Sequence, residues 1–286
     1  MVLKGIGGFY TVYLEDGQKI TCTPRGRVKK AGMNLLAGDR VMVDRAGGGG
    51  TIEEILPRRT ELYRPAIANV DQVVIVMALK KPDLNLFLLD RLLVLAEDQH
   101  LDAPICLNKM DLVKPGDFRE VAETYRGIGY RVLKSSALLS RGIAEIRELL
   151  RDKVSVVAGP SGAGKSTLLN RLFPDLQLKT ADISSKLKRG RHTTRHVELI
   201  PLDSGGVVAD TPGFDQLKVK GIPAANLPFL FPEIGRLGEE CRFKGCLHRG
   251  EPGCRVREAL AAGSLAVSRY DNYMGLLQEI EAERSY

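Results

Sequence analysis

The spacing of apolar residues divides the chain into regions of different character. Up to about residue 62, short segments alternate apolar and polar positions and are separated by turns such as Asp16-Gly17, a pattern typical of strands with one buried face. The predicted strands are Phe9–Leu14, Lys19–Thr23, Asp39–Asp44 and Thr51–Leu56. Several short strands in so few residues predict a small β-barrel of the OB-fold type.

From Asn69 onward, short apolar strands alternate with stretches of helical spacing. The predicted strands are Val73–Ala78, Ile105–Leu107, Arg131–Leu133 and Val154–Ala158. The predicted helices are Leu84–Asp98, Gly142–Leu150 and Lys165–Leu172. Alternation of strands and helices predicts an α/β domain, with a mostly parallel sheet covered by helices on both faces.

The strands stop after about Leu217, where prolines at 223, 228 and 232 interrupt the chain and two helical stretches close it. The last stretch, Tyr270–Glu283, gathers apolar residues on one side, which predicts core packing. These residues are Tyr273, Met274, Leu277 and Ile280. We therefore expect a multidomain protein, with an OB-fold domain over residues 1–62, an α/β domain over 63–217 and a small C-terminal domain over 218–286.

The charge balance favours a polyanionic partner. The chain of 286 residues carries a formal net charge of +7, and its composition is otherwise ordinary for a globular protein. Basic residues cluster on one loop of the predicted barrel, at Arg25, Arg27, Lys29 and Lys30. Cations that neutralise phosphates release counterions, so this loop is a candidate contact for nucleic acid. The alternative is an exposed, well-solvated charged loop.

Membrane insertion is not expected. The longest apolar runs, such as Val73–Leu79 and Val154–Ala158, are much too short to span a bilayer. The first residues, Met1–Tyr10, lack the apolar core and cleavage site of a signal peptide. We expect a cytoplasmic protein without a membrane partner.

A phosphate-binding motif lies between a predicted strand and a predicted helix. Residues 159–166 fit G-x-x-x-x-G-K-[ST], in which glycines let backbone N–H groups point at phosphate oxygens. Lys165 is expected to reach the β- and γ-phosphates, and the Ser166 hydroxyl to bind Mg²⁺. The candidate nucleotide contacts are Gly159, Pro160, Ser161, Gly162, Ala163, Gly164, Lys165, Ser166 and Thr167. ABC-transporter ATPases and nucleoside monophosphate kinases share this sequence motif, so the loop alone does not identify the nucleotide.

Two further motifs favour guanine nucleotides. The strand at Val207 ends in D-x-x-G, where Asp210 can hold Mg²⁺ through water and the Gly213 N–H can sense the γ-phosphate. The motif N-K-x-D follows strand Ile105–Leu107 and supplies Asn108, Lys109 and Asp111. A carboxylate at Asp111 can accept hydrogen bonds from guanine N1–H and N2–H₂, a donor pair that adenine lacks.

A third loop completes the predicted base site. It follows strand Arg131–Leu133 and consists of Ser135, Ser136 and Ala137, which can cover the base with a backbone N–H. An ABC ATPase would need an L-S-G-G-Q signature, and this chain has none. For a nucleoside monophosphate kinase, N-K-x-D and D-T-P-G would have no role, and that interpretation is disfavoured.

The motifs occur in permuted order. The base-recognition motifs precede the phosphate loop, whereas ordinary small GTPases begin with the phosphate loop. The site can survive permutation because the loops lie at one edge of a parallel sheet, where chain order is secondary. In this order the loop at Gly213 leads directly into the C-terminal domain, so the nucleotide state could move that domain.

Four metal-ligand side chains cluster in the C-terminal domain: Cys241, Cys246, His248 and Cys254. Three thiolates and one imidazole describe a closed tetrahedral site for one structural Zn²⁺. A domain this small usually needs a bound metal ion or another cross-link to be stable. The alternatives are clustered free thiols or another metal.

The combination of features resembles a known family, the circularly permuted, ribosome-small-subunit-dependent GTPases of bacteria (ribosome biogenesis GTPase A). The resemblance covers nearly the whole chain. It rests on the basic barrel, Asn69–Gln72, the permuted motifs, Gly190–Thr194 and the cysteine cluster. It implies an OB domain, a permuted GTPase domain and a zinc domain, with GTP and Mg²⁺ bound. It also implies a role in late maturation of the small ribosomal subunit, in contact with its rRNA, and a monomeric protein.

The catalytic group is not obvious from the motifs. The position after D-x-x-G is Phe214, which cannot orient water, so we expect slow intrinsic hydrolysis that a partner stimulates. The resemblance implies His192 as the catalytic residue, and a solvent-exposed loop histidine is the alternative. Thr193 or Thr194 is expected to bind Mg²⁺, with Thr194 favoured. A second hypothesis is a GTP-gated RNA-binding module whose slow hydrolysis only resets it.

Overall fold

The computed structural model describes residues 1–26, 28, 34–46, 48–63, 65–114, 116–174, 197–210, 219 and 221–284. The chain forms two compact units. The first comprises Met1–Val74, Ile143–Val157 and Ser166–Phe214. The second comprises Ile75–Gly142, Ala158–Lys165 and Asp215–Tyr286. Among the described residues, no helix combines the length and apolar character needed to cross a membrane.

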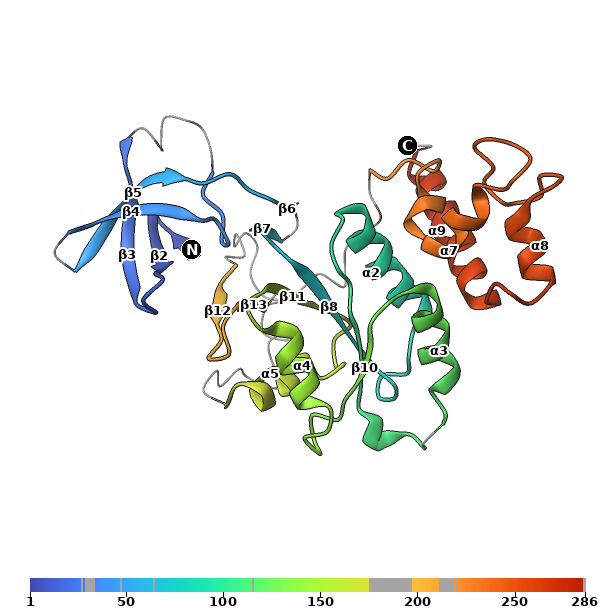
Figure 1. Ribbon diagram of the computed structural model, residues 1–286, viewed down its shortest axis with the longest axis horizontal. Helices are drawn as coiled ribbons and strands as arrows, with labels where there is room; N and C mark the ends of the chain where they lie inside the picture. Colours follow the sequence, from blue (N-terminus) through green and yellow to red (C-terminus); the bar gives the residue numbers. More distant parts are fainter. Residues whose placement is uncertain are drawn as a thin grey trace. The chain divides into compact units, whose positions relative to one another are not determined.

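The first unit begins with a five-stranded sheet in the order β1-β2-β3-β5-β4 (Figure 1). Its strands are β1 (Val2–Ile6), β2 (Phe9–Tyr13), β3 (Lys19–Pro24), β4 (Val41–Ala46) and β5 (Gly49–Ile55). All neighbours pair antiparallel except β3 and β5, which are parallel. Alternate residues point inward, so Val2, Val12, Cys22 and Ile52 form the buried core. This arrangement agrees with the expected OB-fold, and β1 is a strand that the sequence pattern missed.

A two-stranded ribbon of β6 (Glu61–Tyr63) and β7 (Ala66–Ala68) follows the barrel. Ala68 and Asn69 hold the chain against the segment that precedes β4, since Ala68 N donates to Ala37 O at 2.8 Å and Asn69 Nδ2 to Gly38 O at 3.0 Å. Gly38, at φ +92°, has no room for a side chain, because a Cβ would lie 2.0 Å from Ala68 O. The expected domain change near residue 62 thus coincides with a tightly packed ribbon.

The central sheet has the strand order β10-β9-β8-β11-β13-β12. The strands are β8 (Gln72–Ala78), β9 (Ile105–Asn108), β10 (Val132–Lys134), β11 (Val154–Ala158), β12 (Leu199–Pro201) and β13 (Val207–Asp210). The pairs β8–β9, β9–β10 and β11–β13 are parallel, and β12 joins β13 antiparallel. Every residue of β8, β9 and β11 is buried, as expected for strands covered on both faces.

The helices of this region are α2 (Leu86–Asp98), α3 (Arg119–Ile128), α4 (Ile143–Leu150) and α5 (Lys165–Leu172). The Asn85 side chain caps α2 by accepting from Leu88 N at 2.9 Å, which explains why the helix begins there. Helix α3 was missed by the sequence pattern because only Ala122 and Tyr125 of its residues are buried.

The C-terminal part of the second unit contains η4 (Leu227–Leu230), α7 (Pro232–Gly238), α8 (Arg255–Ala261) and α9 (Val267–Arg284). We call the segment from Leu227 to Arg284 the C-terminal module. Tyr273, Leu277 and Ile280 of α9 are buried in its core, which confirms the predicted apolar stripe.

Candidate functional site

The phosphate loop joins β11 to α5 and depends on glycine at two positions. Gly159 has φ +131°, and a Cβ there would lie 2.0 Å from Val76 O on β8. Gly164 has φ +92°, and a Cβ there would lie 2.6 Å from Asn108 Nδ2. Neither the backbone conformation nor the space admits another residue. The loop is therefore fixed against the ends of β8 and β9.

The Lys165 side chain folds back over this loop. Its Nζ donates to Gly159 O at 2.6 Å and to Pro160 O at 3.0 Å, and Ala163 N closes the turn by donating to Pro160 O at 3.1 Å. Ser161, Gly162 and Thr167 are exposed, whereas Ala163 is buried. The loop thus presents an ammonium group beside exposed backbone, an arrangement suited to an anion.

Asn108 connects the predicted phosphate loop with the two loops that are predicted to recognise the base. It lies at the carboxyl end of β9 and is 1% exposed. Its Nδ2 donates to Ala163 O at 3.0 Å, and its Oδ1 accepts from Ser135 Oγ at 3.0 Å and from Ala137 N at 3.3 Å. One buried amide therefore holds three loops together, across separations of 27 to 55 residues in the chain.

The other two polar residues of N-K-x-D point in different directions. Lys109 adopts a left-handed conformation with φ 63°, and its Nζ donates to the carbonyl of Lys81. Asp111 lies beyond the end of β9, in the turn η1 (Met110–Leu112). Its Oδ1 accepts a hydrogen bond from Ser136 Oγ. The Asp111 carboxylate is partly exposed. One oxygen of this partly exposed carboxylate is thus held by the Ser136 hydroxyl.

The Ser135–Ala137 loop is held by backbone hydrogen bonds. Ser135 N donates to Leu107 O at 2.8 Å, and Ser136 pairs in both directions with Arg141, at 3.0 and 3.1 Å. Cys106 lies below it, with its Sγ 3.2 Å from Ser135 Oγ. Burial raises the pKa of this thiol to about 11, so it stays neutral and packs as an apolar group.

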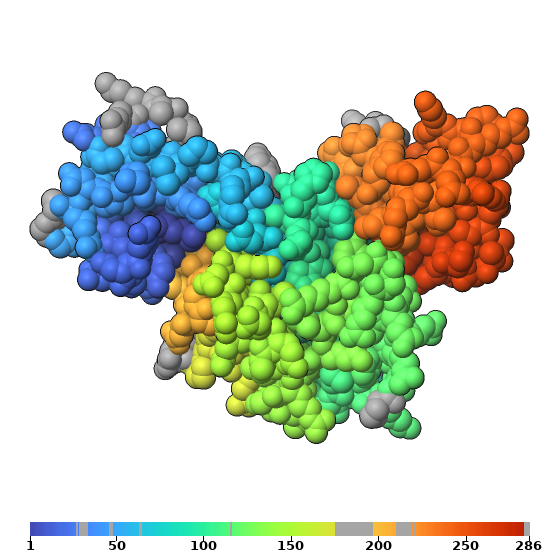
Figure 2. All heavy atoms as spheres, in the orientation of Figure 1, coloured from blue at the N-terminus to red at the C-terminus, as the bar shows by residue number. Residues whose placement is uncertain are grey.

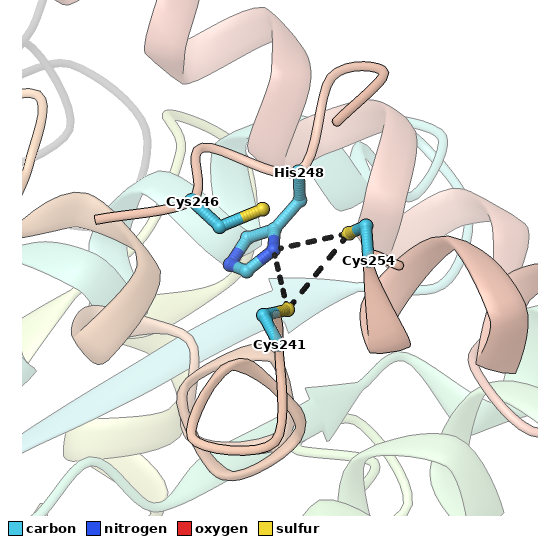
Figure 3. Close-up of side chains that lie close together, drawn as sticks. All are labelled: Cys241, Cys246, His248 and Cys254. Carbon is cyan, nitrogen blue, oxygen red and sulfur yellow. Dashed lines mark hydrogen bonds between the residues drawn. The ribbon is translucent and has the colours of Figure 1, made fainter. Parts of the chain in front are cut away.

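The four predicted metal ligands converge in the C-terminal module (Figure 3). Their ligand atoms all lie within 4.8 Å of one another. His248 Nδ1 is 3.4 Å from Cys254 Sγ and 3.7 Å from Cys241 Sγ, and the two sulfurs are 4.0 Å apart. Tetrahedral Zn²⁺ with Zn–S bonds of about 2.3 Å implies ligand separations of about 3.5–3.8 Å. The donor set and its spacing therefore fit a tetrahedral ion.

The surroundings of these ligands keep His248 in the form that binds metals. Burial lowers the pKa of His248, which favours the neutral imidazole. Its ring lies against Gly238, where a Cβ would come within 3.3 Å of Nε2. Two tyrosines of α9 fix the loop, since Tyr270 donates to His248 O at 2.8 Å and Tyr273 to Leu247 O at 2.9 Å.

Glu251 organises the turn between His248 and Cys254. Its carboxylate accepts from Leu247 N at 2.8 Å, Arg249 N at 2.7 Å and Gly250 N at 2.9 Å. Burial acts to raise the pKa of Glu251, but the backbone N–H donors outweigh it and lower the pKa to about 2. An ionised carboxylate therefore shapes the loop at neutral pH.

Comparison with known proteins identifies the family. Residues 55–220 match the family model described as RsgA GTPase, and residues 1–52 match the RsgA N-terminal domain. The chain belongs to the RsgA GTPase family. It is therefore a GTPase, and its N-terminal and central parts correspond to the two matched regions.

Relatives of this RsgA-family chain extend over its full length. It is 45% identical to the small ribosomal subunit biogenesis GTPase RsgA of Alkaliphilus metalliredigens, over 100% of this chain and 98% of the relative. It is 48% identical to the protein of the same name in Moorella thermoacetica, with the same coverage. Among solved structures, YjeQ from Thermotoga maritima is 38% identical, with a TM-score of 0.86 over 98% of this chain and 97% of that one.

The structure of YloQ, described as a circularly permuted GTPase, is 39% identical, with a TM-score of 0.84 over 99% of this chain and 94% of that one. The RsgA-family chain has the same permuted architecture, since its base-recognition loops follow β9 and β10 and precede the phosphate loop. The predicted fold class is thereby confirmed.

Several predicted site residues lie outside the described part of this RsgA-family chain. These are His192, Thr193, Thr194 and Gly213. Asp210 is the last residue of β13, opposite Val157 of β11, at the same strand end from which the phosphate loop departs. Of the four basic residues on the barrel loop, Arg25 is described, and it forms an ion pair with Glu53 of β5.

Sequence reasoning missed the segment around Lys81 and Pro82. The Lys81 carbonyl holds Lys109, and a Cβ on Gly162 would lie 3.4 Å from Pro82 Cδ, so this segment borders the phosphate loop. Lys80-Lys81-Pro82 lies one residue beyond the end of β8, and a polar turn near a strand end was the available signal.

Proposed function

We propose that this chain binds GTP at the convergence of its three loops and hydrolyses it on the small ribosomal subunit, whose late maturation it assists. The supporting observation is the buried Asn108 amide, which joins the phosphate loop to both base-recognition loops. The relatives named small ribosomal subunit biogenesis GTPase supply the assignment of the partner. In this proposal the subunit stimulates hydrolysis.

Each loop has a role in nucleotide recognition under this proposal. Residues 159–167 wrap the phosphates, with Lys165 at the β- and γ-phosphates. Asp111 accepts from guanine N1–H and N2–H₂, and the backbone of residues 135–137 covers the base. Asn108 and Lys109 act mainly by fixing the loops, since their side chains are engaged with Ala163 and Lys81.

The catalytic step requires a positioned water and charge stabilisation at the γ-phosphate. We propose His192 for the first role, since Phe214 occupies the position after D-x-x-G and has no polar atom. Ser166 and Thr194 would hold Mg²⁺, which would offset the charge developing on the phosphate oxygens. Asp210 would hold Mg²⁺ through water, and the Gly213 N–H would sense the γ-phosphate.

We further propose that Cys241, Cys246, His248 and Cys254 hold one structural Zn²⁺, because their spacing and donor types fit that ion. The functional domains are proposed to span residues 1–62, 63–217 and 218–286, with the first and last contacting rRNA through basic side chains. A monomer acting in the cytoplasm is consistent with binding one subunit at a time.

The test is GTP hydrolysis by the purified chain, alone and with small subunits, large subunits or a bare polyanion. We expect slow turnover by the chain alone and a large rise with small subunits only. Partners that supply missing catalytic groups to GTPases raise the turnover rate by about 10³–10⁵-fold. An equal rise with polyanion would remove the small subunit as the specific partner. If none of them raised the hydrolysis rate, the remaining interpretation would be a GTP-gated RNA-binding module.

The nucleotide assignment has its own test in Asp111→Asn. The amide offers one donor and one acceptor, which mismatches guanine but matches the N1–H and O2 of xanthine. We expect weaker GTP binding and stronger XTP binding by this variant. Unchanged preference for GTP would remove Asp111 from base recognition.

A further inference from the structure

Five polar side chains meet inside the packing of four helices of the second unit. Helices α2 and α3 belong to the central α/β region, and α7 and α9 belong to the C-terminal module. The residues are Asp90, Tyr125, Glu233, Arg269 and Asn272. The side chains of Arg269 and Asp90 are 1% and 0% exposed. Such complete burial of an ion pair is costly unless every polar atom is engaged.

Arg269 is the centre of this cluster. Its Nη1 donates to Asp90 Oδ1 at 2.5 Å, while Nε and Nη2 donate to the two oxygens of Glu233 at 2.6 and 3.0 Å. The guanidinium also lies 4.5 Å from the ring centroid of Phe231 and 5.4 Å from that of Tyr125. Burial opposes the charge, but the two carboxylates outweigh it and raise the pKa of Arg269, which stays protonated.

Asp90 is satisfied by donors from both parts of the unit. Besides Arg269, it accepts from Tyr125 Oη at 2.6 Å and from Asn272 Nδ2 at 2.6 Å. Tyr125 belongs to α3 and Asn272 to α9. The carboxylate of one fully buried α2 residue thus connects α3 and α9.

The contacts around this cluster also connect α2 with α9. Arg91 of α2 donates to both oxygens of Glu279 on α9, at 2.5 and 2.7 Å. Phe87 packs against Gly275, where a Cβ would lie 2.8 Å from its ring. Val94 of α2 belongs to the buried core of the C-terminal module. In the space-filling view, the orange and red module adjoins the teal to green segment that carries α2 and α3 (Figure 2).

The helices that pack around Arg269 are connected to both candidate sites. Helix α2 follows the Lys81–Pro82 segment beside the phosphate loop, and α3 lies between the N-K-x-D and Ser135–Ala137 loops. On the other side, Tyr270, next to Arg269, holds the carbonyl of His248. A shift of α9 would therefore disturb both the Cys₃His loop and the base-recognition side.

We propose that Arg269 is a positioning residue that locks the C-terminal module onto α2 and α3, so that the module is coupled to guanine-nucleotide affinity. The nucleotide part rests on the proposed function. This route is separate from the chain connection after Gly213. Because coupling is reciprocal, a partner that binds the module and shifts α9 changes nucleotide affinity, and bound nucleotide changes the affinity for that partner by the same factor.

The test compares Arg269→Met with Asn272→Ala, Arg269→Lys and the exposed control Arg119→Met, all in the zinc-loaded full-length chain. Amide hydrogen exchange of α2, α3 and α9 measures docking, and titration with a fluorescent GDP analogue measures affinity. We expect faster exchange in all three helices with Arg269→Met and GDP binding weaker by about fivefold or more. Asn272→Ala and Arg269→Lys should give smaller changes in the same direction, and Arg119→Met none.

Two outcomes would overturn the proposal. Unchanged exchange in α2 and α3 would show that Arg269 stabilises α9 alone. Unchanged GDP affinity alongside faster exchange would show docking without coupling. Should Arg269→Met fail to fold, Asn272→Ala decides, since it removes one hydrogen bond and leaves the ion pairs. If the unmodified chain did not bind GDP, the proposed function would fail, while the exchange measurements would still report on docking.

Discussion

The two candidate sites of the second unit are built in different ways. The nucleotide loops are far apart in the chain, and they depart from the ends of β9, β10 and β11, which belong to one sheet. The Cys₃His site draws its ligands from residues 241 to 254 and is shaped by short turns and two tyrosines of α9. The first site is preformed by a large core, whereas the second is local and needs a cross-link among its ligands.

The largest effect should come from removing a metal ligand. Cys254→Ser eliminates one of four donors, and structural zinc contributes roughly 10–16 kcal/mol of apparent binding free energy at pH 7 in small domains. We expect loss of bound zinc and of exchange protection in α8 and the adjoining part of α9. Metal analysis and hydrogen exchange measure both. Cys22→Ser, at a buried cysteine of the barrel, is the control and should retain zinc. Full zinc occupancy in Cys254→Ser would contradict a local, metal-dependent site.

The next effect tests the preformed site. Gly159→Ala places a Cβ 2.0 Å from Val76 O in a left-handed conformation, so the loop must shift. We expect nucleotide binding to fall at least tenfold, with a stability loss of about 1–3 kcal/mol. Gly127→Ala is the control, because a Cβ at this α3 position meets nothing within 4 Å. Equal GDP affinity in the two variants would show that the loop geometry is not needed.

Asn108→Ala removes the side-chain connection between the loops and leaves their backbone sequence unchanged. It removes the hydrogen bonds that the buried amide makes with Ser135 Oγ, Ala137 N and Ala163 O. We expect a loss of about 1–3 kcal/mol in the free energy of urea unfolding. The exposed Asn226→Ala should be nearly neutral. A neutral result for Asn108→Ala would mean that the sheet alone holds the loops.

The smallest effect concerns pH and the local site. The folded pKa of Glu251 is about 2, below its ordinary value of 4.5, so its ionised form stabilises the fold. This contribution is fully present above pH 4.5 and is lost as pH falls toward 2. Because the carboxylate is partly solvated, we expect the free energy of unfolding to be about 1 kcal/mol lower for Glu251→Gln than for the unmodified chain at pH 7. Denaturant unfolding of both at pH 7 and pH 3 should show the difference shrinking in acid. A difference independent of pH would assign the effect to packing.

Much of the fold and both sites followed from local sequence features. Fully apolar runs indicated the strands of the parallel sheet, and the phosphate-loop motif between strand and helix placed the nucleotide site. The four predicted metal ligands could be recognised because they lie close together in the chain. These features could be read from the sequence because each depends on residue type and spacing within one short segment.

Other features were decided only by the tertiary structure. Helix α3 escaped prediction because its buried face consists of two residues, and β1 because its neighbours across the sheet define it. The role of Lys81 depends on a backbone carbonyl, which carries no residue signal. Asp90 and Arg269 are 179 residues apart, and each taken alone reads as a solvent-exposed charge on a helix. Their burial is set by how α2, α3, α7 and α9 pack, and a buried charge can persist only where that packing supplies its partner.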